Sequence, residues 1–370
     1  MNVQQNRGYT TPRTQPDEVI VGYSTRVLSR LLLPFSWIYG LAVWIRNLLF
    51  DAGILKIEKV SVPVISVGNM VAGGTGKTPM VEYLVRHFME HGKNVAVLSR
   101  GYKRASKGTV AIGAKEKNRG NAGMLGDELF QLARKFSQLT VIAGTKRVYS
   151  AKLAIERYGA DVIVLDDGFQ HRALARELDI VMMSSEQPLD KIPMLPAGMR
   201  REPLSSLKRA SVIALSEGTF GRTGLPSRPV IQWKVEPVQL RQVVGEKIIE
   251  LSSLKDKQCI SFCGIANPHR FRGTLETLGL IVQDFIPFPD HHSFSEMDIR
   301  KIQQSVEEHQ AEIIITTEKD AARLLSKPES GTILGSQLYY LAIELRVIQG
   351  EQEFHQIIDS IITGRAVSTM

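Results

Sequence analysis

Cysteine is nearly absent from this chain of 370 residues. Its two cysteines, Cys259 and Cys263, lie in the apolar run CISFCGI, without the partner cysteines that a disulfide framework or a zinc ribbon needs. We expect two reduced, packed thiols, as in a cytosolic fold. Internal repeats and low-complexity tracts are also absent, and a composition of 43% hydrophobic and 23% charged residues is typical of a globular protein.

The N-terminal region lacks the basic-then-apolar layout of a signal peptide. Residues 1–22 are polar and predict a disordered tail. Residues 23–52 contain the run RLLLPFSWIYGLAVWIRNLLF, but only fifteen uncharged residues separate Arg30 from Arg46, whereas a membrane-spanning helix needs about twenty apolar residues. Its two tryptophans and its tyrosine favour the boundary between water and lipid. The segment therefore predicts a helix that lies in or dips into a membrane surface, with a core helix as the alternative.

An acidic excess is also missing. Lysine and arginine together number 46 against 38 acidic residues, which gives a net charge of +8 and a pI near 9.4. This balance permits nucleic acid, anionic lipid or a phosphorylated substrate as a partner, and it is equally compatible with a basic soluble protein.

Short apolar runs rich in valine and isoleucine alternate with helical candidates through the rest of the chain. Their apolarity is continuous, which is typical of parallel strands buried on both faces. We predict a doubly wound, mainly parallel α/β sheet of the P-loop NTPase type over residues 53–226. A turn-rich patch around residues 224–229 and a second α/β set predict a smaller α/β domain over residues 227–370. The runs of the first set are VPVISVG, NVAVLSR, LTVIAG, DVIVLDD, LDIVMM and ASVIALS.

The segment NMVAGGTGKTPM joins the first of these runs to a helical candidate. Glycines let the backbone approach a phosphate closely, and a helix N-terminus favours an anion. Lys77 would reach the β- and γ-phosphates, and Thr78 would hold magnesium. The general motif has glycine where this chain has Val71, and Gly68 could serve a longer loop. The predicted nucleotide-binding residues are Gly73, Gly74, Thr75, Gly76, Lys77 and Thr78.

Polar side chains also follow other predicted strands. The run DVIVLDDGFQH ends in Asp166 and Asp167, which is typical of the magnesium-holding strand of phosphate-loop enzymes, although a helix cap is the alternative. The carboxyl ends of parallel strands share one edge, so we expect these groups to meet there. A mixture of carboxylates and cations suits phosphoryl transfer. The further candidates at this edge are Arg100, Asp127, Glu128, Arg147, Gln170 and His171.

The second domain contributes two runs of interest. FPDHHSF places His291 and His292 after a predicted strand, where they could act in catalysis, belong to a metal half-site or be surface residues. IIITTEKDAARL ends a strand in Thr-Glu-Lys-Asp and distantly resembles the base-reading motif of GTP-binding proteins.

As a set, these motifs resemble the tetraacyldisaccharide 4'-kinase family, the lipid A 4'-kinases of Gram-negative bacteria. The resemblance extends from residue 62 to about residue 322, in one order. Members of that family carry the loop form G-N-x-x-x-G-G-T-G-K-T, so Val71 is no departure within it. The matching runs are VGNMVAGGTGKTP, LSRGYKR, GDE, DVIVLDDGFQHR, LPAGMRREP, GIANPHRF, FPDHHSF and TEKDA.

The resemblance implies transfer of the γ-phosphate of ATP, with Mg²⁺, to the 4'-hydroxyl of a tetraacylated, 1-phosphorylated glucosamine disaccharide, which gives lipid IVA. It implies that Asp127 is the catalytic aspartate and that His291, rather than His292, pairs with it across the interdomain cleft, with Lys77 acting on the phosphates. The implied metal ligands are Thr78, Glu128, Asp166 and Asp167. The implied substrate or phosphate contacts are Arg100, Arg147, Gln170, His171 and Arg201.

The implied partners are the lipid disaccharide and a membrane surface reached through residues 31–50, at the cytoplasmic face of the inner membrane. Neither nucleic acid nor an obligate protein partner is implied. An acylated sugar leaves a bilayer reluctantly, since each buried methylene is worth about 0.8 kcal/mol, so an enzyme acting on it must work at the lipid surface.

Two other classes use similar loops. Membrane-recruited ATPase switches of the partition or cell-division type carry a lysine where this chain has Ala72, and their membrane helix is usually C-terminal. GTP-dependent metallochaperones need a metal-ligand cluster, and the sequence shows no convincing one.

Overall fold

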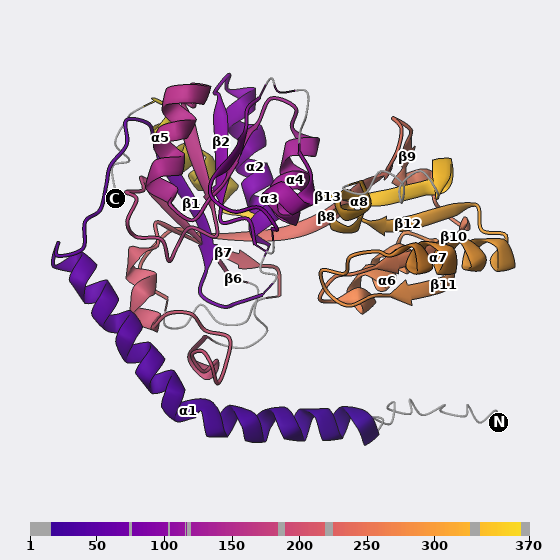
Figure 1. Cartoon of the computed structure of the whole chain (residues 1–370), viewed down its shortest axis with the longest axis horizontal. Helices are drawn as coiled ribbons and strands as arrows, with labels where there is room; N and C mark the ends of the chain where they lie inside the picture. Colours follow the sequence, from indigo (N-terminus) through magenta and orange to yellow (C-terminus); the bar gives the residue numbers. More distant parts are fainter. Residues whose placement is uncertain are drawn as a thin grey trace, which may run out of the picture.

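A single sheet runs through both lobes of the protein (Figure 1). The computed structural model describes residues 16–73, 76–102, 104–114, 116, 120–183, 189–218, 225–325 and 334–363. The strand order is β11-β10-β12-β13-β8-β7-β6-β1-β5-β2-β4-β3, and β9 pairs with β8.

The first lobe has the predicted doubly wound α/β architecture. Its inner strands are parallel, and β3 is an antiparallel strand at the edge. The strands are β1 (Val64–Asn69), β2 (Val95–Ser99), β3 (Val110–Ile112), β4 (Thr140–Ala143), β5 (Val162–Asp166), β6 (Leu178–Met183) and β7 (Val212–Ser216). The helices are α2 (Lys77–Glu90), α3 (Ala122–Leu125), α4 (Asp127–Lys135) and α5 (Arg147–Tyr158), and the 3₁₀ turns η1 (Leu189–Lys191) and η2 (Leu204–Arg209) follow β6.

Both faces of this sheet are buried, which explains the continuous apolar runs. Along β1, Ile65 and Val67 belong to the core cluster that contains the buried face of α2, whereas Val64 belongs to the cluster under α5. Successive strand side chains point to opposite faces, so a strand covered by helices on both sides needs apolar residues at every position. The fold prediction is therefore confirmed, and its strand ends converge on the edge where α2 begins.

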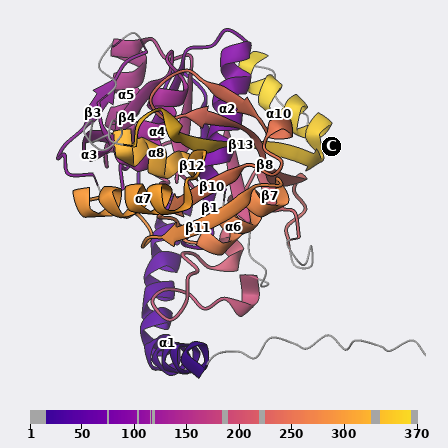
Figure 2. The ribbon, with the colours of Figure 1, turned by 90° about the vertical axis from the view of Figure 1, so that its right-hand side faces the viewer.

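The second lobe extends the same sheet beyond two long antiparallel strands, β8 (Val230–Gln242) and β13 (Leu338–Gln349). Figure 1 shows the two lobes side by side, joined by these strands, and in Figure 2 the second lobe faces the viewer. The remaining elements are β9 (Ile248–Glu250), β10 (Gln258–Cys263), α6 (Pro268–Thr277), β11 (Ile281–Pro287), α7 (Glu296–His309), β12 (Ile313–Thr317), α8 (Glu318–Leu325) and the 3₁₀ turns η3 (Leu251–Ser253) and η4 (Gly335–Gln337).

The sheet continues across the predicted domain boundary at residues 226–227. The start of β8 pairs in parallel with β7, so Ile231 and Trp233 lie in the core of the first lobe. The end of β13 returns to that core, and α10 (Glu351–Thr363) adds Phe354 to it. The local composition predicts the turn before β8, but it does not predict that β8 begins in one lobe and ends in the other.

Helix α1 (Pro16–Asp51) extends away from both lobes in Figures 1 and 2. It begins at Pro16, before the predicted boundary at residue 23. Residues 1–15 of the predicted tail lie outside the described residues. Pro34 lies inside the helix and removes one of its hydrogen bonds, and Figure 1 shows that the helix bends.

Between Ser29 and Asp51, α1 contacts the protein through polar side chains such as Ser36 and Asn47, and most of its large apolar side chains are exposed. Ser36 Oγ donates to Met194 O at 2.9 Å, and Asn47 Nδ2 donates to Glu202 Oε2 at 3.0 Å. Trp37 is 76% exposed, and other exposed apolar residues of the helix are Leu31, Phe35, Ile38, Leu41, Trp44 and Leu48. A core helix would have the opposite arrangement, so the core-helix alternative is wrong. By length and composition, Ser29–Asp51 could cross a membrane.

Candidate active site

The loop between β1 and α2 lies at the carboxyl edge of the parallel strands. Gly76 caps α2 with a φ of 77°, and a Cβ there would lie 2.1 Å from the Cη2 atom of Trp233, so only glycine fits. Lys77 follows at the helix N-terminus, with its Nζ 3.7 Å from Asp167 Oδ1. Thr78 is 7% exposed. Gly74 and Thr75, both predicted to bind nucleotide, lie outside the described residues.

Val71 belongs to an extended segment that pairs with the LPAGMRREP run. It forms an isolated antiparallel bridge with Arg200, and the N–H of Arg201 donates to Met70 O at 2.8 Å. The pairing brings Arg201 to the edge of the phosphate loop, where its NH1 lies 2.9 Å from both carboxylate oxygens of Asp167. A side chain at position 71 is therefore compatible with the loop, because this part is strand-like rather than part of the glycine turn.

Asp166 and Asp167 point in different directions, as adjacent residues at a strand end must. Asp167 has a φ of 53° and faces Lys77 and Arg201. Burial raises the pKa of its carboxyl, but the two cations outweigh that effect and hold the pKa below its usual value. Asp166 is 1% exposed, and its two carboxylate oxygens have no hydrogen-bond partner among the described residues.

The surroundings of Asp166 fit a divalent cation. Burial, together with the neighbouring carboxylates of Glu128 and Asp167, raises the pKa of Asp166 to about 7. A buried carboxylate without a partner is costly, and a bound cation would remove that cost. Oxygen donors from carboxylates and a hydroxyl are those that Mg²⁺ prefers, so Thr78, Asp166 and Glu128 are a suitable set.

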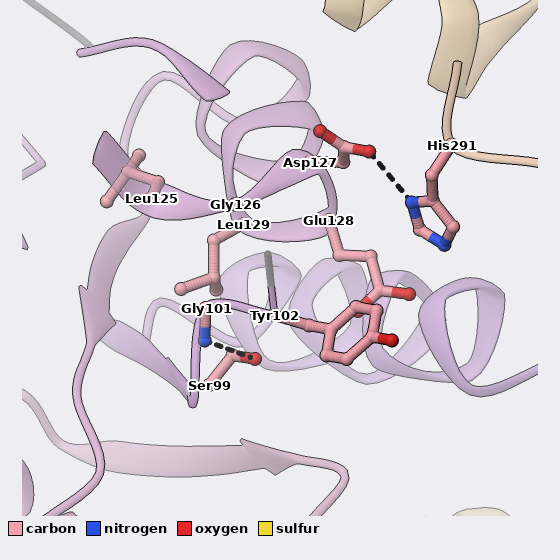
Figure 3. A pocket seen from close by; sticks show the side chains of 9 residues that line it. All are labelled: Ser99, Gly101, Tyr102, Leu125, Gly126, Asp127, Glu128, Leu129 and His291. Carbon is pink, nitrogen blue, oxygen red and sulfur yellow. Dashed lines mark hydrogen bonds and ion pairs between the residues drawn. The ribbon is translucent and has the colours of Figure 1, made fainter. Parts of the chain in front are cut away.

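The second part of the site joins the two lobes. Asp127 begins α4, and His291 follows β11 in a loop with a φ of 62°. His291 Nδ1 lies 3.1 Å from Asp127 Oδ2, and Figure 3 shows the pair above the hollow that both residues line. The ring of Tyr102 lies edge-on to His291, with 5.9 Å between ring centroids. Ser99, Gly126 and Glu128 also line this hollow, so it opens between the end of β2 and the start of α4.

Arg323 of α8 completes this cluster, although sequence reasoning did not find it. Its Nε donates to Asp127 Oδ2 at 2.7 Å, and its NH1 donates to Asp320 Oδ1 at 2.6 Å. Its NH2 lies 3.2 Å from His291 Nδ1. Burial raises the pKa of Asp127, but Arg323 and then His291 outweigh it and hold that pKa below its usual value. Asp127 is thus an ionised carboxylate at neutral pH.

The spacing in TEKDAARL could have revealed Arg323, since Asp320 and Arg323 are three residues apart at the start of a helix. The same contacts correct the base-reading interpretation of this run. Asp320 is fully buried, and its Oδ2 accepts from the N–H of Gly264 at 3.0 Å and from Thr317 Oγ1 at 2.6 Å. It is not available to a nucleotide base.

His292 is engaged elsewhere. Its Nε2 lies 2.9 Å from Asp298 Oδ2 in the first turn of α7, and its ring stacks on Phe288 at 4.8 Å between centroids. The structure therefore brings His291 to Asp127 and leaves His292 in the packing of the second lobe.

The remaining candidates differ in what they can reach. Arg147 is 1% exposed, and its NH2 donates to Asp166 O at 3.4 Å, so it braces the strand end instead of facing a substrate as predicted. It starts α5, and its side chain folds back beneath the strand ends. Gln170 Nε2 donates to Asn69 O at 2.9 Å. Burial, with the charges of Arg147 and Arg100, lowers the pKa of His171 to about 4, so His171 is neutral. Arg100 is exposed at the end of β2.

The glycine loop, the buried carboxylate beside it and the interlobe carboxylate–imidazole pair all converge on one sheet edge. A loop that holds phosphates next to a group able to take a hydroxyl proton is the arrangement of a phosphate-loop kinase. In this protein the second lobe contributes His291 to the side of the site where the acceptor hydroxyl would lie.

Comparison with known proteins gives the family. The model of the tetraacyldisaccharide-1-P 4'-kinase family matches residues 28–363, and this chain belongs to that family. The tetraacyldisaccharide 4'-kinase of Syntrophus aciditrophicus is 36% identical, over 90% of this chain and 93% of that protein. That of Chlorobium phaeovibrioides is 36% identical, over 91% and 99%. The crystal structure of LpxK from Aquifex aeolicus in complex with ATP superimposes with a TM-score of 0.75 and 33% identity, over 90% of this chain and 99% of that one.

Proposed function

We propose that this protein transfers the γ-phosphate of ATP to the 4'-hydroxyl of tetraacyldisaccharide 1-phosphate, giving lipid IVA in lipid A biosynthesis. The observation that carries the proposal is the interlobe pair of Asp127 and His291, 3.1 Å apart, at the edge of the phosphate loop. Membership of the tetraacyldisaccharide-1-P 4'-kinase family supports the same acceptor.

Asp127 is suited to take the acceptor's proton. The 4'-oxygen would form a bond to the γ-phosphorus while the bond from that phosphorus to the oxygen of ADP breaks, and the hydroxyl proton would pass to the Asp127 carboxylate. Arg323 and His291 keep this carboxylate ionised and fix its direction. Because its pKa lies below the usual value, Asp127 is ready to accept a proton over the whole neutral range.

Residues on the nucleotide side would hold the triphosphate. The N-terminus of α2 and Lys77 are placed for its phosphates, and Arg201 is 25% exposed beside Asp167 and could reach the same region. Thr78 and Asp166, with Glu128 next to them, would hold Mg²⁺, which when bound neutralises charge on the phosphate oxygens. Lys77 and Arg201 neutralise Asp167 before the nucleotide arrives.

Helix α1 would attach the enzyme to the cytoplasmic face of the inner membrane. Its outward face carries Trp37 and other exposed apolar residues, while its inward face bonds to the 194–206 segment next to the site. A lipid surface is the partner that suits such a face, because the acylated substrate stays in the bilayer. The net charge of +8 favours an anionic surface.

The experiment is a transfer assay with γ-labelled ATP, magnesium and the lipid disaccharide in detergent micelles. The native protein is expected to label the lipid. Asp127→Asn should lower kcat by a factor of about 10² to 10⁴, because it removes the proton acceptor, and ATP affinity should stay within a few-fold. Labelling by Asp127→Asn at the native rate, or no labelling by the native protein, would refute the proposal.

A further inference from the structure

Imidazoles gather on the opposite side of the first lobe, between α2 and α10. His87 lies in the last turn of α2 and His91 caps its C-terminus, and His355 and Asp359 lie one turn apart on α10. His87 Nε2 is 2.7 Å from Asp359 Oδ1, and the rings of His87 and His91 are 4.4 Å apart between centroids. The centroid of the His355 ring lies 5.2 Å from that of His87, and His355 Nε2 forms a hydrogen bond with the hydroxyl of Tyr83.

Residues at positions i and i+4 present their side chains on one helix face, so each helix offers a pair of donors to the other. One ligand atom from each of His87, His91 and Asp359 lies within 4.8 Å of the other two. Tetrahedral zinc holds its nitrogen and oxygen ligands about 3.3 Å apart, given bonds of about 2.0–2.2 Å. His91 is exposed and the Asp359 side chain is 46% exposed, so both can rotate the small distance required.

His87 is the fixed member of the cluster, since its side chain is only 11% exposed. Its Nε2 atom already faces the carboxylate of Asp359, and the neutral form of imidazole is the one that binds a metal ion.

We propose that His87, His91 and Asp359 form a site for a divalent transition metal of the zinc class, with one coordination position left to water. Two imidazoles and one carboxylate suit zinc, whereas magnesium prefers oxygen ligands alone. The site would join α10 to α2, because Asp359 lies 268 positions after His91 and 272 after His87 in the sequence. A metal site built from such distant residues has no local sequence motif. It is separate from the nucleotide site, because the 14 residues of α2 place about 21 Å between its two ends.

The test is titration of the full chain, free of any polyhistidine tag, with Zn²⁺ in buffer that contains excess Mg²⁺. We expect one zinc per chain with a dissociation constant in the micromolar range or tighter. At a hundredfold excess over that constant, the melting temperature should rise by about 3 to 4 °C, since the metal binds only the folded chain.

His91→Ala removes an exposed ligand and should weaken zinc binding more than about tenfold, with unchanged melting temperature in the absence of zinc and unchanged kinase activity. The matched control is His269→Ala on α6, also exposed, which should bind zinc as the native chain does. Absence of saturable zinc binding, binding that survives His91→Ala, or equal loss in His269→Ala would overturn the proposal.

Discussion

Replacing Arg323 with methionine tests whether this residue keeps the Asp127 carboxylate ionised and in position at the interlobe site. Arg323 is 6% exposed and bonds to both Asp127 and the fully buried Asp320. Methionine keeps much of the side-chain volume but removes the charge and every donor. Asp320 then keeps the N–H of Gly264 and the hydroxyl of Thr317 as partners.

The expected cost in stability follows from this burial. Removing one partner of a buried ion pair costs about 3–5 kcal/mol, and the remaining hydrogen bonds of Asp320 put the expected loss near the lower end, about 3 kcal/mol. For a chain of 370 residues that is a fall in melting temperature of roughly 4 °C. Adding Asp320→Asn removes the uncompensated charge and should restore part of the loss.

The expected effect on activity has a signature in pH. Without Arg323, burial still raises the pKa of Asp127 and only His291 opposes it, so protons compete for the carboxylate at higher pH. The acid limb of the kcat/KM profile should move to higher pH, and kcat should fall about tenfold to a hundredfold as the carboxylate loses its fixed direction. Arg323→Lys keeps the charge without the fork of donors, so its acid limb should lie between the other two. A profile for Arg323→Met that superimposes on the native one would refute the reasoning.

Three further predictions concern other parts of the molecule. His291→Ala should lower kcat about a hundredfold and keep the affinity for ATP, whereas His292→Ala should keep kcat and lower only the stability of the fold. Transfer assays that give the same kcat for both variants would contradict this expectation. Burial and the charge of Glu318 raise the pKa of Glu82 from 4.5 to about 7, so the folded state holds a proton that the unfolded state releases, and stability should fall between pH 4.5 and 7. The raised pKa of the buried Asp166 contributes to the same fall, so thermal melts of Glu82→Gln should show a smaller fall than those of the native chain, and an unchanged fall would contradict the reasoning. Trp37→Glu should lower the partition of the protein into anionic vesicles about thirtyfold, because about 2 kcal/mol of apolar burial in the lipid is lost, and the melting temperature should not change. Unchanged sedimentation with vesicles would count against α1 as the anchor.

The sequence was sufficient to predict features that depend on local pattern. The buried strands, the turn that joins β1 to α2 and the position of Asp166 at the end of β5 follow from apolar runs and from the residue types after them. The choice of His291 over His292 as the catalytic partner came from family resemblance and stays a prediction, and in the structure His291 contacts Asp127 whereas His292 contacts Asp298.

Features that depend on distant contacts were not predictable in this way. Trp233, on β8, covers Gly76 at the start of α2. The two residues are far apart in the sequence, and nothing in the sequence near either of them indicates the contact. Arg323 reaches Asp127 across 196 positions. The family resemblance implied a substrate or phosphate contact for Arg147, but its buried guanidinium donates to the backbone carbonyls of Gly144 and Asp166.

The central claim is tested most directly by locating the transferred phosphate. After reaction with ATP, the lipid disaccharide should carry one additional phosphate ester on its 4'-oxygen, as seen by phosphorus NMR and mass spectrometry, and a substrate with that hydroxyl methylated should gain none. ATP turnover without phosphorylated lipid, as a membrane-recruited ATPase switch would give, or a phosphate on another hydroxyl, would contradict the account.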